Sequence, residues 1–154
     1  MIPNPGDPGC TCYRLRQAGR LVSRLYDQSL APLGINIGQF GLLATLSAMS
    51  GASVMRVANV LQMDRTTLTR NLSPLERLGY ISAGSRSGMR VRALSLTKRG
   101  KDLLKAAKPL WKNAQDGIVK NLGRERAKML HEILEESIDR IQLAEKRSVI
   151  KRSR

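Results

Sequence analysis

Residues 64–80, DRTTLTRNLSPLERLGY, decide the fold. Read as a helix, this stretch places its leucines on one stripe, at the spacing of three or four residues that a core-facing surface has. These leucines are Leu68, Leu72, Leu75 and Leu78. The opposite face carries hydroxyl and guanidinium groups, with Glu76 as the one carboxylate near it. The polar residues of that face are Arg65, Thr66, Thr69, Arg70, Ser73 and Arg77.

The ends of this helix are marked in the sequence. Asp64 is an expected N-cap, because its carboxylate can accept from the free backbone N–H groups of the next turn. Pro74 removes one internal hydrogen bond, so we expect a single helix with a bend at that point. Gly79 is expected to end it.

The pattern on either side completes a winged helix-turn-helix order. Helical spacing predicts helices over 12–30, 37–49 and 54–63, the last with Ser53 as its N-cap. Residues 80–97 alternate and predict a two-stranded hairpin with its turn around Ser87–Gly88. Two long helices follow, separated at 121–123, and the last nine residues are expected to fray. The expected fold class is mostly α with a small β-hairpin wing (α+β).

Composition limits the classes of partner. The 154 residues carry 27 Lys+Arg against 12 Asp+Glu, a formal net charge of +15. Such a charge indicates a polyanionic partner, either nucleic acid or an anionic membrane surface, and a basic ribosomal protein would also fit. The apolar run at 40–49 is too short to span a bilayer, and the N-terminus has no secretory signal. We therefore expect a cytoplasmic protein without a membrane partner.

Charge by region favours DNA. Residues 53–100 hold nine Lys/Arg against two acids. A helix end rich in donors fits the major groove, where Arg reads guanine and Thr contacts base edges or the thymine methyl. The arginines of the hairpin, which suit the narrow minor groove, are Arg86, Arg90 and Arg92. A merely solvated helix face is the alternative, but surface helices usually mix both signs.

The segment LQMDRTTLTRNLSPLERLGYI, followed by LSLTKRG, resembles the MarR family of bacterial transcription regulators over about residues 12–141. The resemblance implies a winged-helix homodimer with interlocked terminal helices that binds short inverted repeats of double-stranded DNA, usually as a repressor. It also implies that Arg90 is the wing-tip arginine, although Gly88 stands where the family commonly has an Asp that pairs with it. The residues placed in the major groove by matching position are Arg65, Thr66, Thr67, Thr69 and Arg70. Ser73, on the same face of the helix, is a further expected DNA contact.

The expected organisation is one MarR-type unit over 1–154. Residues 36–100 would form the DNA-binding part, and 10–35 with 101–148 the helical dimerisation part, between flexible arms at 1–9 and 149–154. The long apolar-striped helices at both ends have little else in the chain to bury against. A second copy of the chain is their natural partner.

The signal that switches the protein is open between two readings. Cys12 at the start of the first helix, with Arg20 and Tyr26, resembles the branch of the family that senses organic hydroperoxides, although a second tyrosine typical of that branch falls at Arg16. The helix dipole favours the thiolate form of Cys12. Cys10 could act as a resolving thiol, but the ring closed across one residue is strained.

The competing signal is a small aromatic or carboxylate effector. Its pocket would draw on cations and rings, namely Arg16, Arg20, Tyr26, Phe40 and Trp111. No cofactor is implied. No metal site is expected either, since two thiols and His131, read as a surface residue, do not make a tetrahedral set.

Two other classes are rivals. An enzyme is improbable, because the sequence has no glycine-rich phosphate loop, no H-E-x-x-H and no Ser/His/Asp set with recognisable spacing. A sequence-blind architectural protein would bind any duplex with nearly equal affinity and steep salt dependence. A regulator would prefer an inverted repeat over random DNA by roughly a thousandfold or more.

Overall fold

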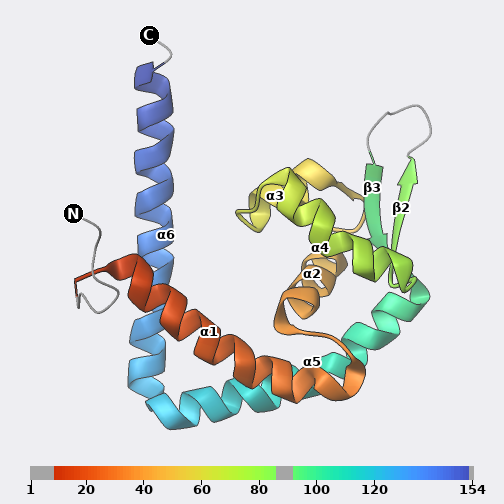
Figure 1. The fold of residues 1–154 in the computed structure, drawn as a ribbon, viewed down its shortest axis with the longest axis horizontal. Coiled ribbons are helices and arrows are strands. Elements are labelled where there is room, and N and C mark those ends of the chain that lie inside the picture. The colour runs from red at the N-terminus through yellow and green to blue at the C-terminus, as the bar shows by residue number, and fades with distance from the viewer. Residues whose placement is uncertain (1–8, 86–91, 153–154) are drawn as a thin grey trace. The chain divides into compact units, whose positions relative to one another are not determined.

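The computed structural model describes residues 9–85 and 92–152, and the order of its elements is that of a winged helix (Figure 1). The chain divides into two compact units, and the boundary along the sequence lies between Ala114 and Gln115. The helices are α1 (Thr11–Leu30), the 3-10 turn η1 (Ala31–Leu33), α2 (Ile37–Ala48), α3 (Val54–Val60), α4 (Arg65–Arg77), α5 (Lys98–Leu122) and α6 (Arg124–Arg152). The strands are β1 (Ala52–Ser53), β2 (Ile81–Ser85) and β3 (Arg92–Leu96). The mostly helical fold with a small wing is confirmed.

The wing is larger than the sequence predicted, because its sheet has three strands in the order β1-β3-β2. β2 and β3 pair antiparallel from Ile81 opposite Leu96 to Ser85 opposite Arg92. The third strand, β1, pairs Ala52 with Leu94. The expected turn at Ser87–Gly88 lies outside the described residues.

The predicted N-caps of α3 and α4 and the predicted end of α4 are confirmed. Ser53 Oγ accepts from the Arg56 N–H (3.2 Å), which caps α3. α4 starts at Asp64 as expected and continues through Pro74. Gly79 follows α4 with φ +71°, a left-handed conformation that glycine adopts without strain.

α2 begins with a capping box that the sequence pattern did not predict. Asn36 and Gln39 form a reciprocal capping box, in which Asn36 Oδ1 accepts from the Gln39 N–H (2.9 Å) and Gln39 Oε1 accepts from the Asn36 N–H (3.0 Å). Asp27 of α1 adds a third acceptor, since its Oδ1 takes the Ile37 N–H at 2.7 Å. The Asp27 side chain of α1 therefore fixes the first turn of α2.

The core of the first unit is aliphatic, as the 3% aromatic content predicts. Leu68 and Leu75 of α4 are fully buried and pack with residues of α2, α3, β3 and α5. Three of the five aromatic residues form one stack on α1, α2 and α5. The Trp111 ring lies 5.7 Å from the Phe40 ring and 6.4 Å from the Tyr26 ring between centroids.

The second unit is helical and has a largely exposed apolar surface. Within it, α6 buries Ala127 but leaves large side chains open to solvent. These exposed residues are Met129, Leu130, Ile133, Ile138, Ile141 and Leu143. α6 continues to Arg152, so residues 146–152 are helical, and the expected fraying of the last nine residues stays a prediction.

Among the described residues, no single helix has the length and apolar content needed to cross a membrane. The required length and apolar content are met only when two segments are taken together, Thr11–Leu33 and Ile37–Ala48, and these are bent by 75° relative to each other.

Candidate DNA-binding surface

Asp64 sets the start of α4. Its Oδ1 accepts from the Thr67 N–H (2.8 Å), and its Oδ2 accepts from the Thr67 hydroxyl (2.6 Å). The hydrogen bond from the Thr67 side chain, followed by that from its backbone, lowers the pKa of Asp64 from its ordinary value. The carboxylate is therefore held in its charged form at the positive end of the helix dipole.

α4 has two opposite faces. Its leucines, Leu68, Leu72 and Leu75, belong to the core. The outward face forms a shallow hollow of about 540 Å³. Its lining residues are Arg65, Thr66, Thr69, Arg70 and Ser73. The structure thus brings together five of the six α4 residues predicted to contact DNA.

Thr67 is the sixth, and it differs from the other five. It is half-buried, it does not line the hollow, and its hydroxyl hydrogen is donated to Asp64. The signal for this was present in the sequence, because the third residue after an N-cap is the position that the cap engages. In the structure Thr67 positions the helix.

The hydroxyls in the hollow are arranged differently from the donor-rich face expected. Thr69 Oγ1 donates to the Arg65 carbonyl (2.8 Å), and Ser73 Oγ donates to the Thr69 carbonyl (3.1 Å). Both oxygens therefore present lone pairs outward, while the donors are the two guanidinium groups. Neither Arg65 nor Arg70 forms an ion pair with another residue of 9–85 or 92–152. The hollow can both donate to and accept from a ligand.

A short turn fixes α4 relative to α3. The Met63 N–H donates to the Ala58 carbonyl (2.9 Å), and Gln62 adopts φ +52° between them. The Asn71 amide contacts Met63 Sδ (3.9 Å) from the α4 side. The two helices are therefore held as a helix-turn-helix, and the predicted helix over 54–63 ends earlier, at Val60.

Of the three wing arginines, only Arg92 lies within the described residues. Arg86 and Arg90 lie outside the described residues. Arg92 begins β3, opposite Ser85 of β2. The structure therefore leaves the predicted minor-groove contacts of Arg86, Arg90 and Arg92 as predictions.

The predicted sensing residues are spread along α1. Cys12, Arg16 and Arg20 are exposed, whereas Tyr26 is buried, and burial raises the pKa of its phenol. Cys12 and Tyr26 are 14 residues apart on one helix, about 21 Å along its axis. Within one chain they therefore do not meet.

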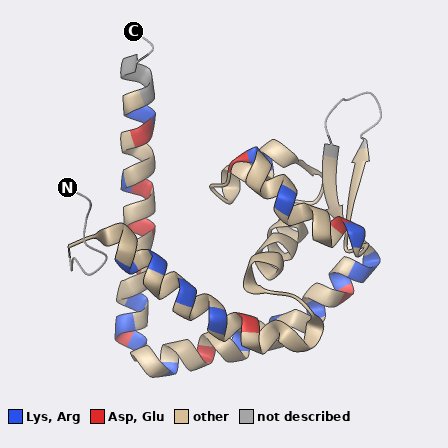
Figure 2. Cartoon of the chain, in the orientation of Figure 1, with Lys and Arg blue, Asp and Glu red and all other residues tan. Residues whose placement is uncertain are grey.

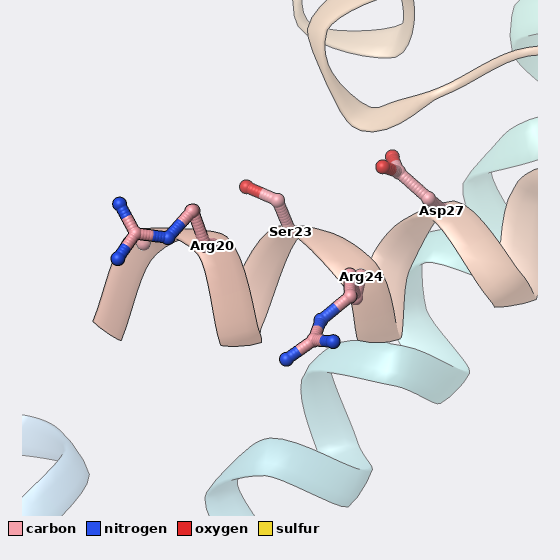
Figure 3. Close-up of a pocket in the computed structure, with 5 residues that line it drawn as sticks. Arg20, Ser23, Arg24 and Asp27 are labelled. Carbon is pink, nitrogen blue, oxygen red and sulfur yellow. The ribbon is translucent and has the colours of Figure 1, made fainter. Parts of the chain in front are cut away.

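A second shallow hollow, of about 510 Å³, lies on α1. Its lining residues are Gly19, Arg20, Ser23, Arg24 and Asp27. Ser23 and Asp27 point to the same side of the helix, and the Arg24 guanidinium points to another (Figure 3). Trp111 stacks with both Tyr26 and Phe40, and none of the three lines this hollow, so a pocket that combines cations and rings stays a prediction.

The turn-linked α3 and α4, the outward hollow on α4 and the antiparallel wing define a winged helix-turn-helix protein. In Figure 2 the ribbon carries the colour of Lys and Arg at positions along α4 and at the start of α5. This is the class of protein in which the second helix of the motif reads the major groove.

Comparison with known proteins shows which winged helix-turn-helix proteins this chain is similar to. The transcriptional regulator MosR of M. tuberculosis, solved in complex with DNA, is 30% identical and superposes with a TM-score of 0.71 over 85% of this chain and 98% of that chain. The repressor CouR, bound to a 23-mer DNA duplex, is 27% identical with a TM-score of 0.77 over 84% of this chain and 92% of that chain. CouR has also been solved bound to p-coumaroyl-CoA. No family model matches the chain.

The curated HTH-type transcriptional regulator YwoH of Bacillus subtilis is 23% identical over 86 residues, which are 56% of this chain and 63% of YwoH. The match thus spans less than two thirds of that relative. The chain belongs to the MarR family of transcription regulators, as the sequence resemblance predicted. Members of this family are regulators and not enzymes.

Proposed function

We propose that this protein is a homodimeric repressor that binds an inverted-repeat operator in the cytoplasm, with α4 as its recognition helix. The observation that carries the proposal is the hollow on α4, which presents Arg65 and Arg70 beside the outward oxygens of Thr69 and Ser73. Arginine suits guanine O6 and N7, and a hydroxyl oxygen can accept from an exocyclic amino group. The DNA-bound relatives MosR and CouR support this assignment.

The homodimer is proposed from the exposed apolar faces of two helices. On α1, Leu15, Val22 and Leu25 are 51%, 37% and 46% exposed. On α6, Ile133 and Ile141 are 55% and 60% exposed. A second copy of the chain would cover both faces, and two-fold symmetry of the protein matches a palindromic site.

Readout by α4 is tested with Arg70→Ala in a fluorescence anisotropy titration. A lost arginine–guanine contact should weaken binding to the inverted repeat by about 1–3 kcal/mol while leaving random duplex nearly unchanged. Lys146→Ala on α6 is the matched control, because it removes one charge outside α4. Equal losses by Arg70→Ala on both duplexes would contradict the readout role and favour the sequence-blind alternative.

For the signal we propose a small organic anion that binds the hollow on α1. The Arg20 guanidinium group and the Ser23 hydroxyl supply a charge and a hydrogen bond for a carboxylate, whereas the Arg24 guanidinium points to another side of the helix (Figure 3). The M. tuberculosis MarR family protein Rv2887, solved in complex with salicylic acid, supports an effector of the aromatic carboxylate type. Addition of such acids to the protein–operator complex should lower its anisotropy, and Arg20→Ala should remove the response.

Thiol sensing is the second candidate, favoured by the exposure of Cys12, which forms no disulfide. In this mechanism Cys12 Sγ attacks the terminal oxygen of an organic hydroperoxide and the O–O bond breaks. Cys12 becomes a sulfenic acid, and the proton of the thiol passes to the departing alkoxide, which leaves as the alcohol. Titration with a hydroperoxide separates the two signals. Release of operator by peroxide in the wild type but not in Cys12→Ser would establish the thiol switch, and binding that ignores peroxide would exclude it.

A further inference from the structure

A stripe of five lysines follows one face of α5. They recur at spacings of three and four residues, so all lie on the same side of the helix. The lysine stripe consists of Lys98, Lys101, Lys105, Lys108 and Lys112. All five are exposed, whereas the buried residues of this helix are Gly100, Leu104 and Ala107. At the rise of an α-helix the stripe is about 21 Å long.

The stripe concentrates charge of one sign. Between residues 98 and 112 the sequence has a single acid, Asp102. Lys98, Lys101, Lys105 and Lys108 form no ion pair with any residue of the described ranges. Like charges three or four residues apart repel one another, and α5 has no acid in its first turn to favour its dipole. A polyanion lying along the helix would relieve this repulsion.

Duplex DNA is the polyanion that best fits the stripe. Lysine is a compact charge on a flexible stem, which binds phosphate without the fixed two-point geometry of arginine. A length of about 21 Å covers roughly six base-pair steps of one DNA strand. A contact of this kind is independent of base sequence.

The lysine stripe faces a different direction from the hollow on α4. Leu104 and Ala107 of α5 and Leu68 of α4 belong to the same core, so the exposed faces of the two helices both point away from it. α2 lies between α4 and the first half of α5 (Figure 1). A straight duplex held by α4 therefore leaves the stripe open to another segment.

We propose that the lysine stripe is a second, sequence-blind DNA-binding surface, which lets one molecule hold two duplex segments. This rests on the proposed function, because the first segment is the operator bound by α4. Bridging of this kind would bring an operator close to other DNA without any further protein.

A bead assay with the full-length protein tests the inference. Inverted-repeat duplex from the gene's own upstream region is immobilised, protein is bound, and retention of a labelled random duplex is measured. The triple variant K101Q/K105Q/K108Q should lose most of the retention, while its affinity for a single operator duplex in anisotropy stays within about twofold of wild type. Loss of three phosphate contacts should also lower the slope of log retention against log salt by about 2.7.

Two matched variants keep the result specific. K120Q/K128Q/K146Q removes the same charge outside the stripe and should bridge like wild type, and K101R/K105R/K108R keeps the charge and should also bridge. Equal retention by the two glutamine variants would overturn the inference. The inference would also be overturned if K101Q/K105Q/K108Q bridged DNA like wild type but lost binding to phosphatidylglycerol vesicles. The stripe would then be a membrane-binding surface. If the wild type binds no operator, it is the proposed function that fails.

Discussion

The Thr97 hydroxyl donates a 2.7 Å hydrogen bond to the Gly79 carbonyl oxygen, which joins the end of α4 to the start of α5. Thr97 Oγ1 also accepts from the Gly100 N–H (3.0 Å), so Thr97 caps α5. The Thr97 N–H donates to the Tyr80 carbonyl (3.1 Å). These contacts explain the L-T-x-x-G segment after the wing, because one threonine holds both helices at the base of the sheet.

Gly100 is required for this joint, and we predict that Gly100→Ala destabilises the protein. A Cβ at this position would meet the Tyr80 carbonyl oxygen, a backbone atom that cannot turn aside. The expected loss in the free energy of unfolding is about 1–3 kcal/mol, measured by urea denaturation. Gly41→Ala is the control, since nothing lies within 4 Å of a Cβ there and it should gain about 0.5–1 kcal/mol. Similar midpoints for the two variants would contradict the close approach.

Thr67 and Thr69 should separate stability from DNA binding. Thr67→Val removes the hydroxyl that donates to Asp64, so we expect a lower melting temperature with the preference for inverted repeat retained. Thr69→Val removes an outward oxygen from the hollow and should reduce that preference, with little change in melting temperature. Thermal unfolding and anisotropy on both variants check the two effects. If Thr67→Val lowered the preference for the inverted repeat and Thr69→Val lowered the melting temperature, Thr67 would be the residue that contacts DNA.

Asp64 should make stability depend on pH in the acid range. Its pKa is lowered in the folded protein, so its charge stabilises the fold above the ordinary value of 3.8, and this contribution is lost as the pH falls through the folded pKa. Asp64→Asn keeps the capping oxygen but has no charge. We therefore expect wild type to melt at a higher temperature than Asp64→Asn near neutral pH, with the two converging below pH 3.8. A constant difference across this range would refute the contribution of the charge.

Tyr26 should make stability depend on pH in the alkaline range. Burial raises the pKa of its phenol above 10.0, so the neutral form stabilises the fold below that value and the contribution declines as the pH rises through the folded pKa. Tyr26→Phe cannot ionise and should retain its stability at higher pH better than wild type does. Thermal melts across the alkaline range, followed by the fluorescence of Trp111, give the comparison. Parallel declines for the two proteins would mean that another group dominates.

The sequence predicted the parts of the fold that depend on local chemistry. Asp64, Ser53 and Gly79 were assigned correctly, because a cap or a left-handed residue is determined by its immediate neighbours. Strand β1 was missed, since two residues carry no alternation and Ala52 becomes a strand only by pairing with Leu94. The position of Trp111 between Tyr26 and Phe40 likewise depends on three helices that spacing alone cannot orient.

The candidate site shows the same division. The outward face of α4 followed from helical periodicity, and five predicted residues line one hollow. The role of Thr67 did not follow, because periodicity places a residue on a face but does not say where its hydroxyl hydrogen goes. The separation of Tyr26 from the hollow on α1 depends on packing against Trp111, which a single helix does not encode.

The most direct measurement is the ratio of affinities for an inverted repeat from the upstream region and for a scrambled duplex of equal length, at fixed physiological salt. A homodimeric regulator that reads bases through α4 predicts a ratio of roughly a thousand or more, with one dimer bound per repeat. A ratio near one, with affinity governed by salt alone, would contradict base readout and leave a protein that binds DNA only through its charge.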